Sequence, residues 1–117
     1  MFDSTRAYEH YRRGVTASKE GRLDEAEPLF RSSWALGPHF KTAEELGKLL
    51  EKLNKIDDAI LFLAAAVGLG PATGPARIYL ASCLSKAGDP LSAWAQIQMV
   101  LEHRPYGTTG TSSLVSR

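Results

Sequence analysis

The strongest constraint on the fold is that the sequence resembles itself at intervals of 33 and 34 residues. Ala26 recurs as Ala59 and again as Ala93. Three other sets recur at the same spacing: Gly14, Gly47 and Ala81; Phe30, Leu63 and Ile97; and Pro38, Pro71 and Pro105. This period is typical of helix-turn-helix arrays, in which each unit is one helix pair that buries its apolar face against its neighbours. The chain is therefore expected to be a helical solenoid.

Six helices follow from apolar residues that recur three and four positions apart instead of alternating, and no strand is expected. Gly21, Asn54 and Gly88 follow the first helix of each pair, where a residue in the left-handed conformation ends a helix at low cost. Asp89 and Pro90 then favour a helix start as an N-cap and a first helical residue. The expected helices are 4–19, 24–36, 40–53, 57–67, 74–86 and 90–103.

These repeats resemble the tetratricopeptide repeat family, whose pattern is Leu-Gly, a large residue three positions on, Ala-x-x-x-Phe and a closing Pro. The second repeat matches it with Leu46-Gly47-x-x-Leu50, Ala59-x-x-x-Leu63 and Pro71. The third matches it with Leu80-Ala81-x-x-Leu84, Ala93-x-x-x-Ile97 and Pro105. The first matches it with Gly14, Gly21, Ala26, Phe30 and Pro38. The resemblance implies an all-α, right-handed superhelical solenoid of three antiparallel helix pairs.

A single domain is expected over residues 1–107, with repeats at about 7–39, 40–73 and 74–107. The 117 residues and the 44% hydrophobic content suit one domain with a continuous core. Residues 108–117 are rich in Gly, Ser and Thr and contain few apolar side chains. A disordered polar tail is expected there, because so few apolar groups cannot offset the entropy lost on ordering.

Composition argues against several kinds of partner. Fourteen Lys and Arg against thirteen Asp and Glu leave a charge of +1, so no net field attracts nucleic acid or anionic lipid. Cys83 is the single cysteine, which excludes an intramolecular disulfide. The amino terminus lacks the order of a secretory signal, and the most apolar run, 59–69, is too short to span a bilayer. We expect a soluble, cytoplasmic protein.

No set of residues suggests catalysis or metal binding. His10, His39 and His103 lack the four-residue spacing that puts two imidazoles on one helix face. Cys83 lies among apolar residues and is expected to be a packed thiol, not a nucleophile. The glycine-rich segment 68–75 lacks the Lys-Ser or Lys-Thr ending of a phosphate-binding loop. We expect no enzyme, no cofactor and no metal.

In tetratricopeptide proteins the first helix of each pair lines a concave groove that receives peptides, and the resemblance implies such a groove here. The candidate groove residues are Tyr8, Tyr11, Val15, Lys19, Glu44, Lys48, Lys52, Ile78, Ser82 and Lys86. In this set the tyrosines would anchor an apolar side chain, and the lysines would form a flank for an acidic partner. The other interpretation is a solvated helix face, on which mixed Lys and Glu charges stabilise the helix.

One known type of groove is argued against by the residues present. The family's clamp for the carboxylate of chaperone tails needs Lys, Asn and Arg at fixed places in the three first helices. The matching places here hold Tyr11, Val15, Glu45, Pro75 and Tyr79. The sequence therefore predicts that this clamp is absent.

A second candidate surface is the last helix, because solenoids usually end in a polar capping helix and none follows Pro105. Trp94, Met99 and Leu101 are candidates for an exposed apolar edge, unless the tail covers them or the exposed area is small. The favoured function is a protein-interaction module or small adaptor that binds a peptide segment of a partner in the groove. The alternative is a self-associating scaffold, a homo-oligomer joined through this edge.

Overall fold

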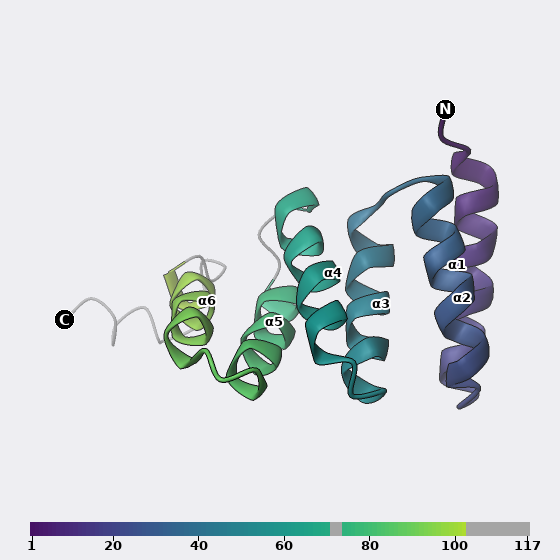
Figure 1. Cartoon of the computed structure of the whole chain (residues 1–117). Coiled ribbons are helices and arrows are strands. Elements are labelled where there is room, and N and C mark those ends of the chain that lie inside the picture. Colours follow the sequence, from purple (N-terminus) through teal and green to yellow (C-terminus); the bar gives the residue numbers. More distant parts are fainter. Residues whose placement is uncertain (71–73, 103–117) are drawn as a thin grey trace, which may run out of the picture.

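The computed structural model describes residues 1–70 and 74–102. Within these residues the regular structure consists of six helices: α1 (Ser4–Lys19), α2 (Leu23–Leu36), α3 (Phe40–Lys52), α4 (Ile56–Leu69), α5 (Gly74–Lys86) and α6 (Pro90–Glu102). Figure 1 shows them as three consecutive pairs stacked in chain order, with α1 and α2 at one end and α6 at the other. The predicted all-α solenoid of three helix pairs is confirmed.

The residues that end the first helix of each pair adopt the predicted conformation. Gly21, Asn54 and Gly88 have φ angles of +81°, +62° and +88°, in the left-handed region where glycine and asparagine are least strained. Asp89 caps α6 by accepting a hydrogen bond from the Ser92 backbone nitrogen at 3.1 Å. These local signals explain why each expected helix start and each described helix end lies within two residues of its predicted position.

The largest differences from the predicted helices lie at the end of α4 and at the end of the chain. Helix α4 runs to Leu69, two residues beyond the predicted end. The predicted end of the last helix at His103 and the predicted polar tail at 108–117 lie outside the described residues. Those two predictions therefore stay predictions.

The helices of a pair cross where a glycine faces a large apolar side chain. A Cβ added to Gly14 would lie 2.8 Å from the Phe30 ring, and one added to Gly47 would lie 2.5 Å from Leu63. Phe30 and Leu63 are 1% and 0% exposed, so both side chains are fully buried in the core. The recurring glycine and the recurring large residue therefore form the same packing contact in both repeats. Glycine is needed there because it allows the two backbones to approach closely.

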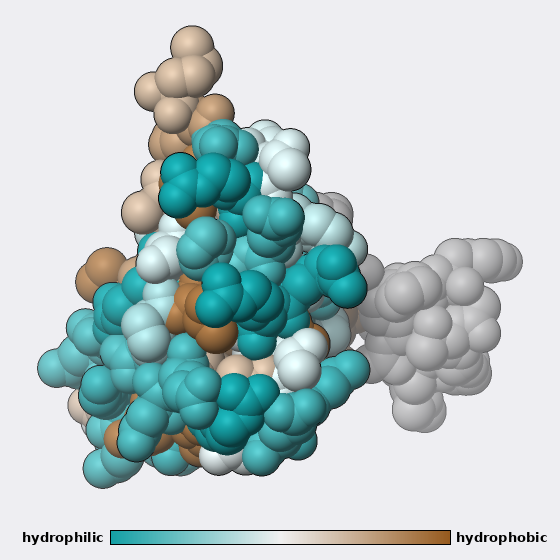
Figure 2. Space-filling view, turned by 90° about the vertical axis from the view of Figure 1, so that its right-hand side faces the viewer, coloured by the Kyte–Doolittle hydropathy of each residue, from teal (hydrophilic) through white to brown (hydrophobic). Residues whose placement is uncertain are grey.

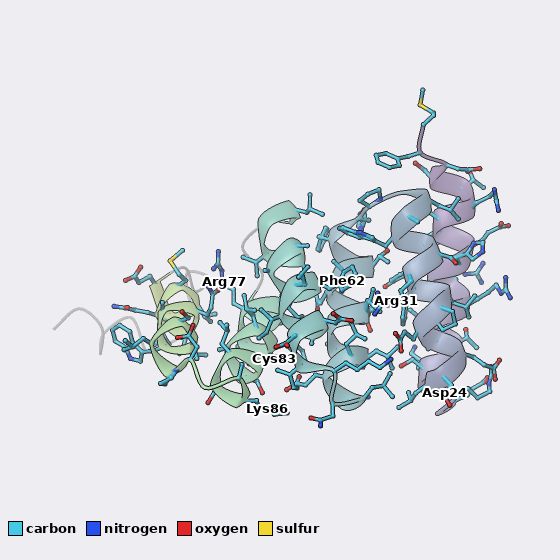
Figure 3. All side chains as sticks on the ribbon, viewed as in Figure 1. Asp24, Arg31, Phe62, Arg77, Cys83 and Lys86 are labelled. Carbon is cyan, nitrogen blue, oxygen red and sulfur yellow. The ribbon has the colours of Figure 1, made fainter. Side chains whose placement is uncertain are left out.

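Ion pairs join the first two repeats along α2 and α4. Glu27 on α2 accepts a hydrogen bond from Lys55 at 2.9 Å, and this bond holds the pKa of Glu27 below its ordinary value. Arg31 donates a hydrogen bond to Asp58 at 3.1 Å, and its guanidinium lies 5.6 Å from the centre of the Phe62 ring. Figure 3 shows Arg31 and Phe62 near each other. These contacts join the second helix of repeat one to the second helix of repeat two.

The two ends of the array differ in polarity. Figure 2 views the end formed by the N-terminal helix pair and shows a largely hydrophilic surface. Helix α6, at the other end, exposes large apolar side chains, including Leu91 and Trp94. Exposed apolar side chains also occur at the start of the chain, at Met1, Phe2 and Tyr8, but on α6 they follow one helix.

Candidate functional site

Helices α1 and α3 form the walls of a depression of about 420 Å³, here called the lysine hollow. It is lined from α1 by Tyr11, Val15, Ser18 and Lys19, and from α3 by Glu45, Lys48, Leu49 and Lys52. The lining residues are spaced three or four positions apart or adjacent on each helix, so the hollow runs along the C-terminal parts of both helices. Five predicted groove residues border this one space: Tyr11, Val15, Lys19, Lys48 and Lys52.

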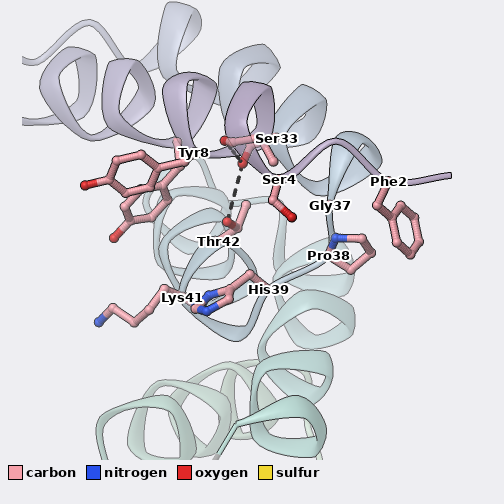
Figure 4. Close-up of a pocket in the computed structure, with 11 residues that line it drawn as sticks. Phe2, Ser4, Tyr8, Ser33, Gly37, Pro38, His39, Lys41 and Thr42 are labelled. Atoms are coloured by element: carbon pink, nitrogen blue, oxygen red, sulfur yellow. Dashed lines mark hydrogen bonds between the residues drawn. The ribbon is translucent and has the colours of Figure 1, made fainter.

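A second depression of about 340 Å³, here called the tyrosine hollow, lies nearer the start of α1 (Figure 4). Tyr11 lines both hollows. Its lining consists of Phe2, Ser4, Ala7, Tyr8, Tyr11, Ser33, Gly37, Pro38, His39, Lys41 and Thr42. The rings of Tyr8 and Tyr11 stack with centroids 6.3 Å apart. The two tyrosines that the sequence predicts for one end of a groove therefore line one hollow together, and Tyr11 also lines the lysine hollow.

Three polar side chains of the tyrosine hollow, Ser33, Thr42 and His39, already have partners within the chain. Ser33, which is 1% exposed, donates a hydrogen bond from its Oγ to the Ala7 carbonyl oxygen at 2.7 Å, and its Oγ lies 3.4 Å from the Thr42 Oγ1. The His39 Nδ1 accepts a hydrogen bond from the Lys41 backbone nitrogen at 3.1 Å. A ligand group that enters this hollow meets aromatic and aliphatic surface, and an apolar group suits it best.

Acidic side chains lie beside Tyr11, between the two hollows. Burial raises the pKa of the Tyr11 hydroxyl, and the negative charges of Glu45 and Glu44 raise it further. Glu44, a predicted groove residue, is only 5% exposed, because the first turn of α3 is enclosed and Thr42 and Ala43 are buried with it. Glu44 therefore contributes charge to the groove and almost no contact surface.

Two lysines of the predicted flank are occupied within the chain. The Lys48 Nζ lies 3.5 Å from the Glu45 carboxylate and 5.2 Å from the centre of the Tyr79 ring. The Lys86 Nζ donates to the Glu51 carboxylate at 2.9 Å. Their charges are largely balanced before any ligand arrives, because an opposite charge lies within ion-pair distance.

Glu51 joins the second and third repeats. It accepts hydrogen bonds from Lys86 at 2.9 Å and from the Ser82 hydroxyl at 2.8 Å. Burial acts to raise the pKa of Glu51, but the hydrogen bonds from Lys86 and Ser82 outweigh it and the pKa is lowered. In residues 1–70 and 74–102, Lys19 and Lys52 are the predicted flank lysines without an ion pair.

The structure does not bring every predicted groove residue into the two hollows. Ile78, Ser82 and Lys86 lie on α5, outside both linings, and Ile78 is half exposed. Sequence reasoning missed the contribution of the loop between α2 and α3, where Pro38 and His39 line the tyrosine hollow. A signal for it was the small residue Gly37, since a Cβ there would lie 3.2 Å from Ala7.

The predicted apolar edge on α6 is present in part. Trp94 and Leu101 are 62% and 50% exposed, and Ile97 between them is 37% exposed. These residues lie three and four positions apart and therefore share one side of the helix. Met99 is half-buried and lies on another side, because each residue turns the helix by about 100°.

Ile97 is more exposed than the residues at the same position of the first two repeats. Phe30 and Leu63 occupy the same place in repeats one and two and are 1% and 0% exposed, within a core that the next helix pair continues. In the part of the chain that the structure describes, no helix follows α6. The stripe of Trp94, Ile97 and Leu101 is therefore uncovered in the described part of the chain.

Cys83 has the properties of a packed thiol, as predicted. It is 0% exposed, and burial, followed by the charge of Glu51, raises its pKa to about 11. No group of three His, Cys, Asp or Glu side chains that could hold a metal ion occurs among the described residues. None of the six described helices is long and apolar enough to cross a membrane.

No protein-family model matches the chain. No curated protein matches it. Solved structures do. The first tetratricopeptide domain of Spaghetti (RPAP3), bound to the HSP90 peptide SRMEEVD, has a TM-score of 0.83 at 21% identity and is matched over 98% of this chain and 92% of that one.

Two other solved structures agree on the architecture. The Yersinia enterocolitica type III secretion chaperone SycD, in complex with a peptide of the translocator YopD, has a TM-score of 0.81 at 16% identity, over 98% of this chain and 88% of that one. MamA from AMB-1 has a TM-score of 0.75 at 27% identity, over 89% of this chain, and the match spans 57% of MamA. These likenesses confirm that the chain has a tetratricopeptide-repeat fold.

Proposed function

We propose that this chain is a protein-interaction module whose α1–α3 groove binds a peptide segment of a partner protein. The observation that carries the proposal is that two hollows, both lined by helices of the first two repeats, share Tyr11 in their linings. Two of the similar solved structures are peptide complexes, which supports the same use of the fold. The proposed role is binding without catalysis, cofactor or metal.

The groove is suited to binding because its walls are helices that the core already fixes. Val15 on α1 and Leu49 on α3 pack against or within the same apolar core. The walls therefore lose little conformational entropy when a ligand arrives, and the ligand carries most of the ordering cost. An apolar side chain that is fully buried in the tyrosine hollow would gain about 1.5–3 kcal/mol.

The test is binding of peptides selected from a displayed random library, measured by fluorescence polarisation. Val15→Glu places a longer, charged side chain in the lysine hollow, where it fills the space and pairs with Lys19, and Lys52→Glu reverses the charge at the end of the hollow. Each variant is expected to weaken binding about tenfold or more. Arg13→Glu makes the same charge change as Lys52→Glu on an exposed residue outside both hollows, and binding should stay at the wild-type level.

The proposal fails if the groove variants bind selected peptides as tightly as wild type while their circular dichroism and thermal unfolding are unchanged. It also fails if the library yields no binding peptide. Loss of binding in Arg13→Glu alone would locate the ligand on the face formed by α1 and α2.

A second candidate function is self-association through α6. The observation that favours it is the stripe of Trp94, Ile97 and Leu101 on a helix whose single charged residue is Glu102. Two copies could bring these stripes together with little charge repulsion, whereas the surface of the α1–α2 end is largely hydrophilic (Figure 2). A symmetric dimer is therefore the expected assembly.

Light scattering coupled to size-exclusion chromatography tests this second function. Wild type should run as a dimer at high protein concentration, and Trp94→Glu should halve its mass. Tyr8→Ser, an exposed aromatic replaced at the opposite end of the array, should leave the dimer intact. A wild-type monomer at every concentration up to the millimolar range would exclude the scaffold.

A further inference from the structure

The lysine hollow has an uncompensated positive end. Lys19 is the last residue of α1 and Lys52 the last residue of α3, and both border the hollow. Both side chains are exposed, and within the described part of the chain neither has an ion pair. A ligand carboxylate placed between them would gain two charge-assisted contacts without breaking an internal one.

The other end of the groove is apolar and has no free charge directed into it. The stacked rings of Tyr8 and Tyr11 form one wall of the tyrosine hollow, and Pro38 lies opposite in the α2–α3 loop (Figure 4). Its volume of about 340 Å³ accommodates a large side chain. An aromatic or long aliphatic residue fills such a space best, because aromatic side chains bury much area and stack at these distances.

The middle of the groove disfavours a second acidic group. Glu44 and Glu45 lie close enough to Tyr11 to raise the pKa of its hydroxyl, and Lys48 is already paired with Glu45. Glu44 lies 3.9 Å from the Lys41 Nζ, so both lysines beside these carboxylates are already paired and neither is free for a ligand carboxylate. The groove therefore has an order: apolar at one end, internally paired charges in the middle and free positive charge at the other end.

The two ends are separated by a distance that the helix fixes. Tyr8 and Lys19 lie eleven residues apart on α1. With a rise of 1.5 Å per residue, this separation is about 16 Å. An extended peptide covers about 3.3 Å per residue, so about five residues span the same distance.

We propose that the groove selects an extended peptide in which an apolar residue, preferably aromatic, and an acidic residue stand four to six positions apart. The apolar side chain fills the tyrosine hollow and the carboxylate lies between Lys19 and Lys52. This inference rests on the proposed function of the groove and adds the chemistry and the length of the ligand. The family's chaperone-tail clamp uses other places, which this chain fills with Tyr11 and Val15.

Selection from a displayed library of random twelve-residue peptides tests the inference. Enriched peptides should pair an aromatic or long aliphatic residue with Asp or Glu at the stated spacing. A synthetic peptide of the enriched sequence should lose at least tenfold in affinity when the acidic residue becomes Gln or Asn, and again when two Gly residues lengthen the spacing. Its affinity should also fall as salt is added, because both lysines are exposed.

Variants of the protein test which end of the groove sets each part of the peptide preference. The double variant Lys19→Glu with Lys52→Glu should exchange the enriched Asp or Glu for Lys or Arg and leave the apolar preference unchanged. Tyr8→Ser, at a residue that is 61% exposed, should weaken the apolar preference and leave the acidic one. Arg13→Glu should change neither preference.

The outcomes separate this inference from the proposed function. Peptides that bind without an acidic residue at the stated spacing, or a double variant that keeps its preference for Asp and Glu, would overturn the inference and leave the groove as a peptide site. The lysines would then act only on the negative ends of their own helices. If no peptide binds, both proposals are overturned.

Discussion

A Cβ added to Gly47 would lie 2.5 Å from the Leu63 Cγ and 3.3 Å from the Leu63 backbone nitrogen. Leu63 is 0% exposed, and one of the close contacts is its backbone, so the helices must shift to admit a methyl group. Gly47→Ala is therefore expected to lower the free energy of unfolding by about 1–2 kcal/mol, because the overpacking cost exceeds the gain of about 1 kcal/mol in helix propensity. Urea denaturation followed by circular dichroism measures the change.

Gly68 supplies the matched control, because it lies in α4 and a Cβ there would meet nothing within 4 Å. Gly68→Ala should raise the free energy of unfolding by up to about 1 kcal/mol through helix propensity alone. Equal effects of the two substitutions would contradict the close crossing at Gly47.

Glu51→Gln is expected to cost about 1 kcal/mol near pH 7, since Lys86 is half exposed and water screens its pair with Glu51. The pKa of Glu51 is lower in the folded chain than in the unfolded one. Its carboxylate therefore stabilises the fold above the ordinary Glu pKa of about 4.3, and this contribution is lost as the pH falls through the lower, folded pKa.

The difference in unfolding free energy between wild type and Glu51→Gln should accordingly be constant from neutral pH down to about pH 5 and shrink below about pH 4. Thermal melts across this range measure it. Glu9→Gln, at an exposed carboxylate, provides the comparison. A difference that persists unchanged at pH 3 would show that the Glu51 contact does not depend on its charge.

The Cys83 thiol is expected to react with iodoacetamide at least about 100-fold more slowly in the folded chain than in denaturant, because a pKa of about 11 leaves little thiolate at pH 7.5. Burial at 0% exposure slows the reaction further. Mass spectrometry of timed samples gives both rates. Rapid labelling in native buffer would mean that α5 opens readily.

Ser33→Ala should lower the free energy of unfolding by about 1 kcal/mol, because the buried hydroxyl joins α2 to the Ala7 carbonyl of α1. Ser85→Ala, at an exposed position on α5, should be neutral or slightly stabilising through helix propensity. Denaturant unfolding of both variants checks the pair. An equally small effect at both sites would mean that the Ser33 hydrogen bond contributes nothing.

The fold could be predicted from sequence because its determinants are local and repeated. Gly21, Asn54 and Gly88 each mark a helix end on their own, and each takes a positive φ angle. The recurrence of Gly14 as Gly47 with large residues sixteen positions later indicates the crossing of a pair without knowledge of the tertiary structure. Such signals can be recognised in a single sequence because each depends only on residues that are close together along the chain.

The candidate site was less predictable, because its properties depend on residues far apart in sequence. Lys86 and Glu51 lie 35 positions apart, and nothing in their local spacing shows that they pair. Glu44 has the spacing of an exposed residue, yet the surrounding helices bury it. Which groove lysines stay unpaired is decided by the packing of one repeat on the next.

The partial exposure of Ile97 affects the order in which the array opens. The α5–α6 pair has one neighbouring pair, and its Ile97 is 37% exposed. The central pair is closed tightly by Gly47 and Leu63 and has a neighbouring pair on both sides. In a linear array the least supported pair frays first, so amide protons of α6 should exchange with solvent soonest and those of α3 and α4 last. The α1–α3 groove would stay folded while the α5–α6 end unfolds locally and refolds.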